Sequence, residues 1–238
     1  MLMFGKNGNP LFVKDDETLK TFSPEAYAEF GGESSIEELA FYFYQTDGHW
    51  YMTSDSGRKY QMDNYPLDQG RGYIVFTGAA LQKGATLTDS GAVAQGDLPI
   101  ALPKSTFFLS GNAMPSDFKL KEFKAVSGNT IKLSSANFKL LFFGKDGNMQ
   151  LVKDNERLAA FCPEAYAEFG GEGSIEEFAL YFYQSDSHWY MTSDTARKYV
   201  MDDYVIQAGE GFTVFCGAAL AKGATFTVPA AIEASAAE

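Results

Sequence analysis

Cysteine, histidine and tryptophan each occur only twice among the 238 residues of this chain. Both cysteines, Cys162 and Cys216, lie in the second half, so the first half cannot supply a zinc site with cysteine ligands. No apolar run comes near the ~20 residues that a membrane-spanning helix requires. These shortages exclude a zinc site repeated in both halves and a helical membrane span.

Basic residues are scarce relative to acidic ones. The 19 Lys and Arg residues face 31 Asp and Glu residues, which gives a net charge of −12. A surface of this charge repels the phosphate backbone of nucleic acids, and the basic residues are scattered instead of forming a stripe. We therefore expect no DNA or RNA partner.

Repetition is the most prominent feature that the sequence does have. Residues 1–88 align with residues 140–227 without a gap, and about two-thirds of the aligned pairs are identical. The motif PEAYAEFGG at residues 24–32 returns at residues 163–171. A period this long indicates two copies of a whole domain and not a solenoid of small units.

The second copy carries an additional segment. Residues 97–139 precede its shared part and have no counterpart before the first copy. Two interpretations remain open: the chain is a fragment of a longer protein, or the first copy naturally lacks these strands. The second interpretation predicts an exposed sheet edge where the first copy begins, formed by Met1, Leu2, Met3 and Phe4.

Such an edge predicts self-assembly. A neighbouring chain would fill it by adding a strand, either its C-terminal tail after Thr227 or its residues 97–139. A head-to-tail contact of this kind does not close, so it builds a filament or a lattice.

Local patterns favour short strands. Asn-Gly and Asp-Gly pairs mark tight turns between apolar stretches. Residues 41–44 alternate Phe and Tyr, so a strand there would place Phe on one face and Tyr on the other. A Pro at the first position and a Gly pair at the end predict a short helix at residues 24–30, capped by Ser23, and a copy at residues 163–169.

The predicted fold is therefore mainly β. We expect two tandem homologous domains, each sandwich- or barrel-like with a short helix. The first domain spans residues 1–89 and is incomplete at its N-terminal side, and residues 90–96 form a linker. The second domain spans residues 97–228, and residues 229–238 form a tail.

Motifs for catalysis are missing. Ser54 and Ser193 lie in Thr-Ser-Asp and not in Gly-x-Ser-x-Gly, and no glycine-rich phosphate loop occurs. His49 and His188 each follow a turn and precede a Trp, which favours a hydrogen-bonding role at a hairpin over metal ligation. We expect no enzyme, no catalytic residue and no cofactor.

A calcium site is harder to exclude from the sequence than a zinc site. Asp15 and Asp16 of the first copy recur as Asp154 and Asn155. The twelve-residue calcium loop with its closing Glu is absent, and turns stabilised by Asx side chains explain these residues better.

An aromatic hairpin is the one constellation that resembles a binding site. Sugar rings stack on flat aromatic faces, and each copy could present such a platform. The candidate residues are Tyr42, Tyr44, Trp50 and Tyr51 in the first copy and Tyr181, Tyr183, Trp189 and Tyr190 in the second. The alternative is that the Trp and Phe residues form the core while the tyrosines decorate a sheet. Burial of these rings would favour this alternative, and exposure of the rings on one face would favour sugar binding.

The two cysteines leave another choice open. Cys162 and Cys216 replace Ser23 and Thr77 of the first copy together, which permits a disulfide confined to the second copy. The alternative is two isolated buried thiols.

Residues 100–115 contain a strand followed by a Gly-Asn-x-x-Pro turn, and residues 209–215 form a Gly-x-Gly-aromatic strand. Together with the aromatic hairpin, they resemble β-rich repeats of large secreted bacterial cell-surface proteins. The resemblance covers the second copy fully and the first from Phe4 onward. It implies an extracellular location and a structural or adhesive role.

The sequence thus predicts a non-enzymatic, extracellular, self-assembling surface protein whose partner is another copy of itself or a larger surface protein. A carbohydrate-binding module with glycan partners is the alternative.

Overall fold

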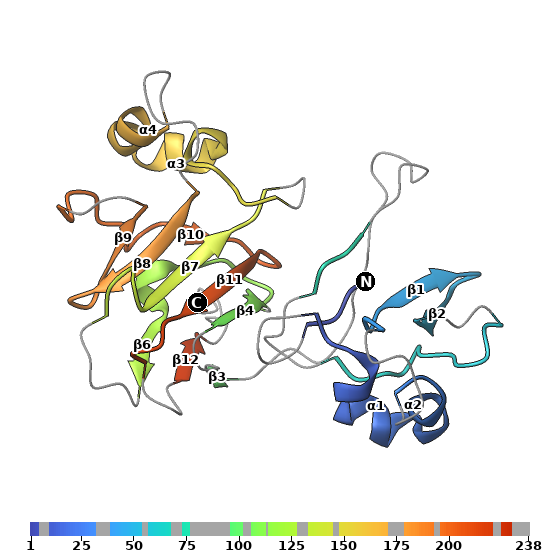
Figure 1. Cartoon of the computed structure of the whole chain (residues 1–238). Coiled ribbons are helices and arrows are strands. Elements are labelled where there is room, and N and C mark those ends of the chain that lie inside the picture. Colours follow the sequence, from blue (N-terminus) through green and yellow to red (C-terminus); the bar gives the residue numbers. More distant parts are fainter. Residues whose placement is uncertain are drawn as a thin grey trace, which may run out of the picture. The chain divides into compact units, whose positions relative to one another are not determined.

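The computed structural model of the chain separates it into two compact units, Met1–Gly91 and Ala92–Glu238, which we call unit 1 and unit 2 (Figure 1). The structure describes residues 1–4, 10–31, 39–53, 57–67, 73–76, 96–101, 106–112, 114–127, 133–144, 148–170, 179–192, 196–220 and 225–229. Apart from Gly96 and Pro229, the predicted linker and tail lie outside this part of the chain.

Unit 2 is built mainly from short antiparallel strands, as the sequence predicts. Its largest sheet has five strands in the order β4-β11-β7-β8-β9. These strands are β4 Thr106–Gly111, β7 Phe138–Phe142, β8 Tyr181–Ser185, β9 His188–Met191 and β11 Gly211–Cys216. A second sheet has the order β3-β12-β6, with β3 Leu98–Ala101, β6 Lys124–Ser127 and β12 Thr225–Val228. The two-residue strands β5 Phe118–Lys119 and β10 Val205–Ile206 pair with each other.

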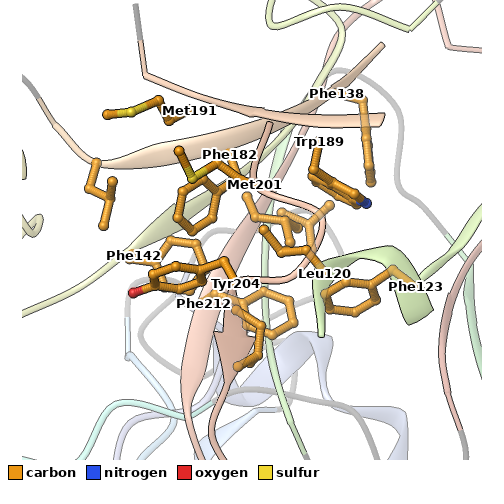
Figure 2. Packing of buried hydrophobic residues seen from close by; sticks show 14 of the residues in the cluster. Leu120, Phe123, Phe138, Phe142, Phe182, Trp189, Met191, Met201, Tyr204 and Phe212 are labelled. Carbon is orange, nitrogen blue, oxygen red and sulfur yellow. The ribbon is translucent and has the colours of Figure 1, made fainter. Parts of the chain in front are cut away.

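The two larger sheets of unit 2 share one hydrophobic core. Phe226 of β12 lies 5.8 Å from Phe138 of β7 and 6.5 Å from Phe212 of β11, measured between ring centroids. Figure 2 shows this cluster, in which aromatic side chains from several strands surround Leu120. Unit 2 is therefore a sandwich-like arrangement of sheets over an aromatic core.

The two predicted helices are present with the predicted bounds, α2 Pro24–Phe30 and α4 Pro163–Phe169. Each is preceded by a short helix that the sequence analysis did not predict, α1 Glu17–Phe22 and α3 Glu156–Phe161. Single 3-10 turns occur at η1 Val13–Asp15, η2 Leu120–Glu122 and η3 Val152–Asp154. None of the helices in the described part of the chain has the length and apolar character needed to cross a membrane.

The helix caps differ from the prediction. Ser23 stands at the N-cap of α2 without a side-chain hydrogen bond. The capping side chain belongs instead to Asp16, whose carboxylate accepts from the Leu19 N–H at 3.0 Å and from the Tyr65 hydroxyl at 2.6 Å. Because Asp16 is buried, it caps α1 and ties this helix to residues nearly fifty positions later in unit 1.

Unit 2 uses an amide at the equivalent cap. The Asn155 side-chain oxygen accepts from the Leu158 N–H at 2.8 Å. Its amide group donates to the Tyr204 hydroxyl at 3.1 Å and to the Gln150 side-chain oxygen at 3.2 Å.

Unit 1 repeats the aromatic hairpin of unit 2. Strands β1 Phe43–Thr46 and β2 His49–Met52 pair in the same register as β8 and β9. The turn residues Asp47 and Gly48 adopt φ angles of 52° and 80°, which is the left-handed conformation expected of a two-residue hairpin turn. Phe41 and Phe43 are buried, whereas Tyr42 is exposed, so the predicted division between a Phe face and a Tyr face is confirmed.

A buried threonine closes this hairpin in both units. The Thr192 hydroxyl accepts from the Tyr181 N–H at 2.6 Å and donates to the Ala179 carbonyl at 2.6 Å. Thr53 makes the same contacts with Tyr42 and Ala40 in unit 1. The hydroxyl thus satisfies buried backbone groups at the point where the strands separate.

Replacing Thr192 with Val should destabilise the protein by roughly 1–3 kcal/mol, because the buried backbone groups would lose their partner while the side-chain shape is kept. Thr192→Ser, which keeps the hydroxyl, should cost less. Chemical denaturation followed by tryptophan fluorescence measures both variants. Equal stability of Thr192→Val and the parent would contradict this role.

Candidate functional site

Residues 1–4 do not form the open edge that the sequence predicts. Leu2 forms antiparallel bridges with Tyr42 on one side and Ile74 on the other. The Met1 carbonyl accepts from the Phe43 N–H at 2.8 Å, and Met3 is fully buried. Leu2 therefore holds the inner position that β7 has in unit 2, and Phe4 forms a bridge with Pro10. The prediction of an assembly edge at these residues is wrong.

The open edge lies on the other side of Ile74. In unit 2 the equivalent strand β11 is paired with β7 on one side and with β4 on the other. In unit 1, Val75 is 45% exposed, whereas the equivalent Val214 is 0% exposed. Phe76 reaches 82% exposure. Among the described residues of unit 1, no strand takes the place of β4 along this edge.

A second position that is buried in unit 2 is exposed in unit 1. Leu67 is 40% exposed, whereas its counterpart Ile206 is fully buried. Ile206 belongs to β10, where it lies opposite Phe118 of β5. Unit 1 has no sequence equivalent of β5, which explains why Leu67 remains in contact with solvent.

The equivalent tryptophans of the two units also differ in burial. Trp189 is 1% exposed in unit 2, because Phe123 and Phe138 lie against it at 5.8 and 5.9 Å between ring centroids. Figure 2 shows Trp189 inside this cluster with Phe123 and Phe138. The equivalent Trp50 is only partly buried. The same residue thus has two environments in two copies of one scaffold.

The elements that cover these positions in unit 2 come from one part of the sequence. β4, β5, η2 and Phe123 all belong to residues 98–138, which we call the covering segment, and this segment has no counterpart in unit 1. We call the positions that it would cover the uncovered face of unit 1. They are Trp50, Leu67, Ile74, Val75 and Phe76. The repeat alignment revealed the missing strands, but only the sheet order shows which strand they would join.

The aromatic platform does not form as predicted. In the hairpin register Tyr44 pairs with Tyr51, while Trp50 pairs with Gln45. Neighbouring residues of a strand point to opposite faces, so Trp50 lies on the face away from Tyr42 and Tyr44. In unit 2, Tyr183, Tyr190 and Trp189 are all buried, and Tyr181 is half-buried. One flat platform containing tyrosines and Trp in each unit is therefore contradicted by the register.

The histidines take part in hairpin hydrogen bonds. His49 Nδ1 lies 2.7 Å from the Asp63 carboxylate, which also accepts from the Trp50 N–H at 2.7 Å. His188 and Asp202 repeat this arrangement at 2.7 Å. Within the described ranges, no three His, Cys, Asp or Glu side chains gather in a way that could hold a metal ion. Ser54 and Ser193 lie outside those ranges.

A second polar cluster joins helix α2 to the segment after the hairpin. The Glu29 carboxylate accepts from the Lys59 ammonium and from the Tyr60 hydroxyl, both at 2.6 Å. These bonds hold the pKa of Glu29 below its ordinary value. Glu168, Lys198 and Tyr199 form the same cluster in unit 2. In each unit the cluster links the helix to the segment after the hairpin, and its groups are hydrogen-bonded to one another. We call it the Glu–Lys–Tyr clip.

The two cysteines are free thiols, so the structure does not contain the disulfide considered from the sequence. Cys162 is half-buried at the junction of α3 and α4. Cys216 is fully buried in the core of unit 2, and burial raises the pKa of its thiol to about 12.

A thiol reagent such as Ellman's reagent should therefore modify Cys162 in the native protein and leave Cys216 unreacted. After unfolding in guanidinium chloride, both thiols should react. Cys162→Ser provides the control, because this variant should lose the native reaction and keep the second one. Absence of reactive thiols in the unfolded, unreduced chain would indicate a disulfide.

Asp63 gives a prediction for acid stability. The Trp50 N–H, His49 and Gln61 all bond its carboxylate and lower its pKa to about 2. A depressed native pKa contributes stability above the ordinary value near 4, and this contribution is lost as the pH falls toward 2. Asp63→Asn should therefore flatten the dependence of unfolding stability on pH between about 4 and 2. Denaturant titrations at several pH values would show it, and an unchanged slope would contradict it.

Comparison with known proteins adds no relative: the chain matches no family model and no curated protein, and no solved structure matches it.

Proposed function

We propose that this chain is a non-enzymatic structural protein that assembles with further copies through the uncovered face of unit 1. The observation that carries this proposal is the contrast between Val75 and Val214. The residue type and strand position are the same, yet one side chain is 45% exposed and the other is fully buried. Unit 1 thus presents to solvent a position that is buried in unit 2.

The unpaired backbone groups of an open strand edge support an interaction at this face. An exposed strand edge offers unpaired backbone groups to any other chain, and natural proteins usually protect such edges with charge, proline or a cover. Residues 74–76 are Ile, Val and Phe, and all three are exposed. Exposed apolar residues along an open strand edge favour pairing with a strand of another protein.

The remaining polar clusters support a structural role over catalysis. The His–Asp pair, the Glu–Lys–Tyr clip and the buried threonine each occur in both units, and each connects elements of the scaffold. Their donors and acceptors are engaged with one another. A catalytic site would need a group free to meet a substrate.

An extracellular or cell-surface location belongs to the same proposal and is supported by the resemblance to secreted β-rich repeats. Glycan binding has less support, because Trp50 and Tyr44 lie on opposite faces of the hairpin. The partner that we propose is therefore protein, namely another copy of this chain.

The proposal predicts that the purified protein self-associates as its concentration rises. Val75→Lys should weaken association by at least about tenfold, because a charge would have to be buried in the contact. Sedimentation velocity over a concentration series measures this. Val200→Lys is the matched control, since Val200 is 48% exposed on unit 2 and its counterpart in unit 1 is the polar Gln61.

Both variants change an exposed valine to lysine, so both should keep the circular dichroism spectrum and unfolding midpoint of the parent. A parent chain that stays monomeric at all concentrations would overturn the proposal. So would association that Val75→Lys leaves unchanged.

A further inference from the structure

We propose that two copies of unit 1 join edge to edge about a two-fold axis that passes between their Val75 residues. This inference rests on the proposed function and specifies its contact. The partner is a second copy of this chain, and the surface is the same strand edge on both copies.

Val75 directs its backbone groups away from Leu2. Ile74 exchanges both backbone hydrogen bonds with Leu2, at 2.7 and 3.3 Å. In an antiparallel sheet, successive residues direct their N–H and C=O groups to opposite edges. The N–H and C=O of Val75 therefore point away from Leu2, toward the side where unit 2 has β4. They are in position to accept another strand.

The covering segment is already engaged in its own unit. Its strands β3, β4 and β5 pair with β12, β11 and β10 of unit 2. Donating it to unit 1 of another copy would uncover the donor's own unit 2. The open edge of unit 1 is available for a contact between copies without such an exchange.

A two-fold axis at Val75 fixes which side chains meet across the contact. If Val75 lies opposite Val75 of the second copy, then Ile74 lies opposite Phe76 of that copy, and the reverse holds by symmetry. Both side chains are exposed in the single chain, and such β-branched and aromatic cross-strand pairs stabilise antiparallel sheets. Unit 2 offers a parallel, because Phe215 packs there on Phe107 of β4 with ring centroids 5.1 Å apart.

The described residues of this edge carry no charge that would repel a second copy. A two-fold contact places each residue of the edge near its own copy or near its neighbours, so any charge would meet a like charge. Residues 73–76 are Tyr, Ile, Val and Phe and carry no charge at neutral pH. The edge is thus compatible with its own copy.

Cysteine cross-linking tests this geometry. Opposed residues in a hydrogen-bonded antiparallel pair have Cα atoms about 5.5 Å apart, within the range that a disulfide spans. Val75→Cys, made in a Cys162→Ser background, should form a covalent dimer rapidly under a mild thiol oxidant. Val200→Cys in the same background is the matched control and should cross-link at least about tenfold more slowly, because no contact holds two copies of it together. Serine is the natural residue at the equivalent of Cys162, namely Ser23.

Sedimentation completes the test. Edge pairing about a two-fold axis uses up the edge of both copies, so association should stop at two chains. Association that depends on Val75 but grows beyond two chains, or equal cross-linking of both cysteine variants, would overturn the two-fold contact and leave the proposed function standing. A chain that does not associate at all would overturn both.

Discussion

The two units differ most in the backbone hydrogen bonds along one strand edge, formed by β11 in unit 2 and by the equivalent residues in unit 1. In unit 2, β11 has a strand on both sides, and its backbone groups are satisfied by β4 and β7. In unit 1 the equivalent residues are paired only toward Leu2 within the described part of the chain. Burial of a backbone group without a partner is costly, so an edge of this kind must meet water or another strand. The exposure of Ile74 and Phe76 accompanies this difference, whereas Leu67 is exposed where unit 2 has β5.

The two units also show that residue identity does not fix residue environment. Val75 and Val214 are the same amino acid at the same place in the same scaffold, as are Trp50 and Trp189. In unit 2, Val214 pairs with Phe108 of β4 and Trp189 packs on Phe123, whereas no described residue of unit 1 takes these places. Meanwhile the polar contacts inside the scaffold, such as the Thr53 and Thr192 bonds, are the same in both units. Local contacts therefore belong to the repeat, whereas the outer surface depends on the chain around it.

Sequence reasoning succeeded where the signal was local. Proline at the first helical position and glycine at the end located α2 and α4, and the Phe–Tyr alternation gave the correct faces of the hairpin. It missed α1 and α3 because Asp16 and Asn155 resemble turn residues when the tyrosine that each contacts lies 49 positions away. It misplaced the open edge because strand order is a non-local property. Met1–Phe4 looked terminal in the sequence, yet two later segments close around it.

The cap that begins α1 and α3 bears on how the two copies can change over time. Asp16 only accepts hydrogen bonds, and it is matched by the apolar Leu11 at the position where unit 2 has Gln150. Asn155 has an amide that also donates, and Gln150 receives one of its bonds. Transfer of the asparagine alone into unit 1 would place its amide at a cap where Leu11, whose side chain offers no acceptor, stands in place of Gln150. Transfer of the aspartate alone into unit 2 would keep a partner, because the Gln150 amide can turn its NH2 group toward a carboxylate. Exchange between the two halves is therefore asymmetric at this cap.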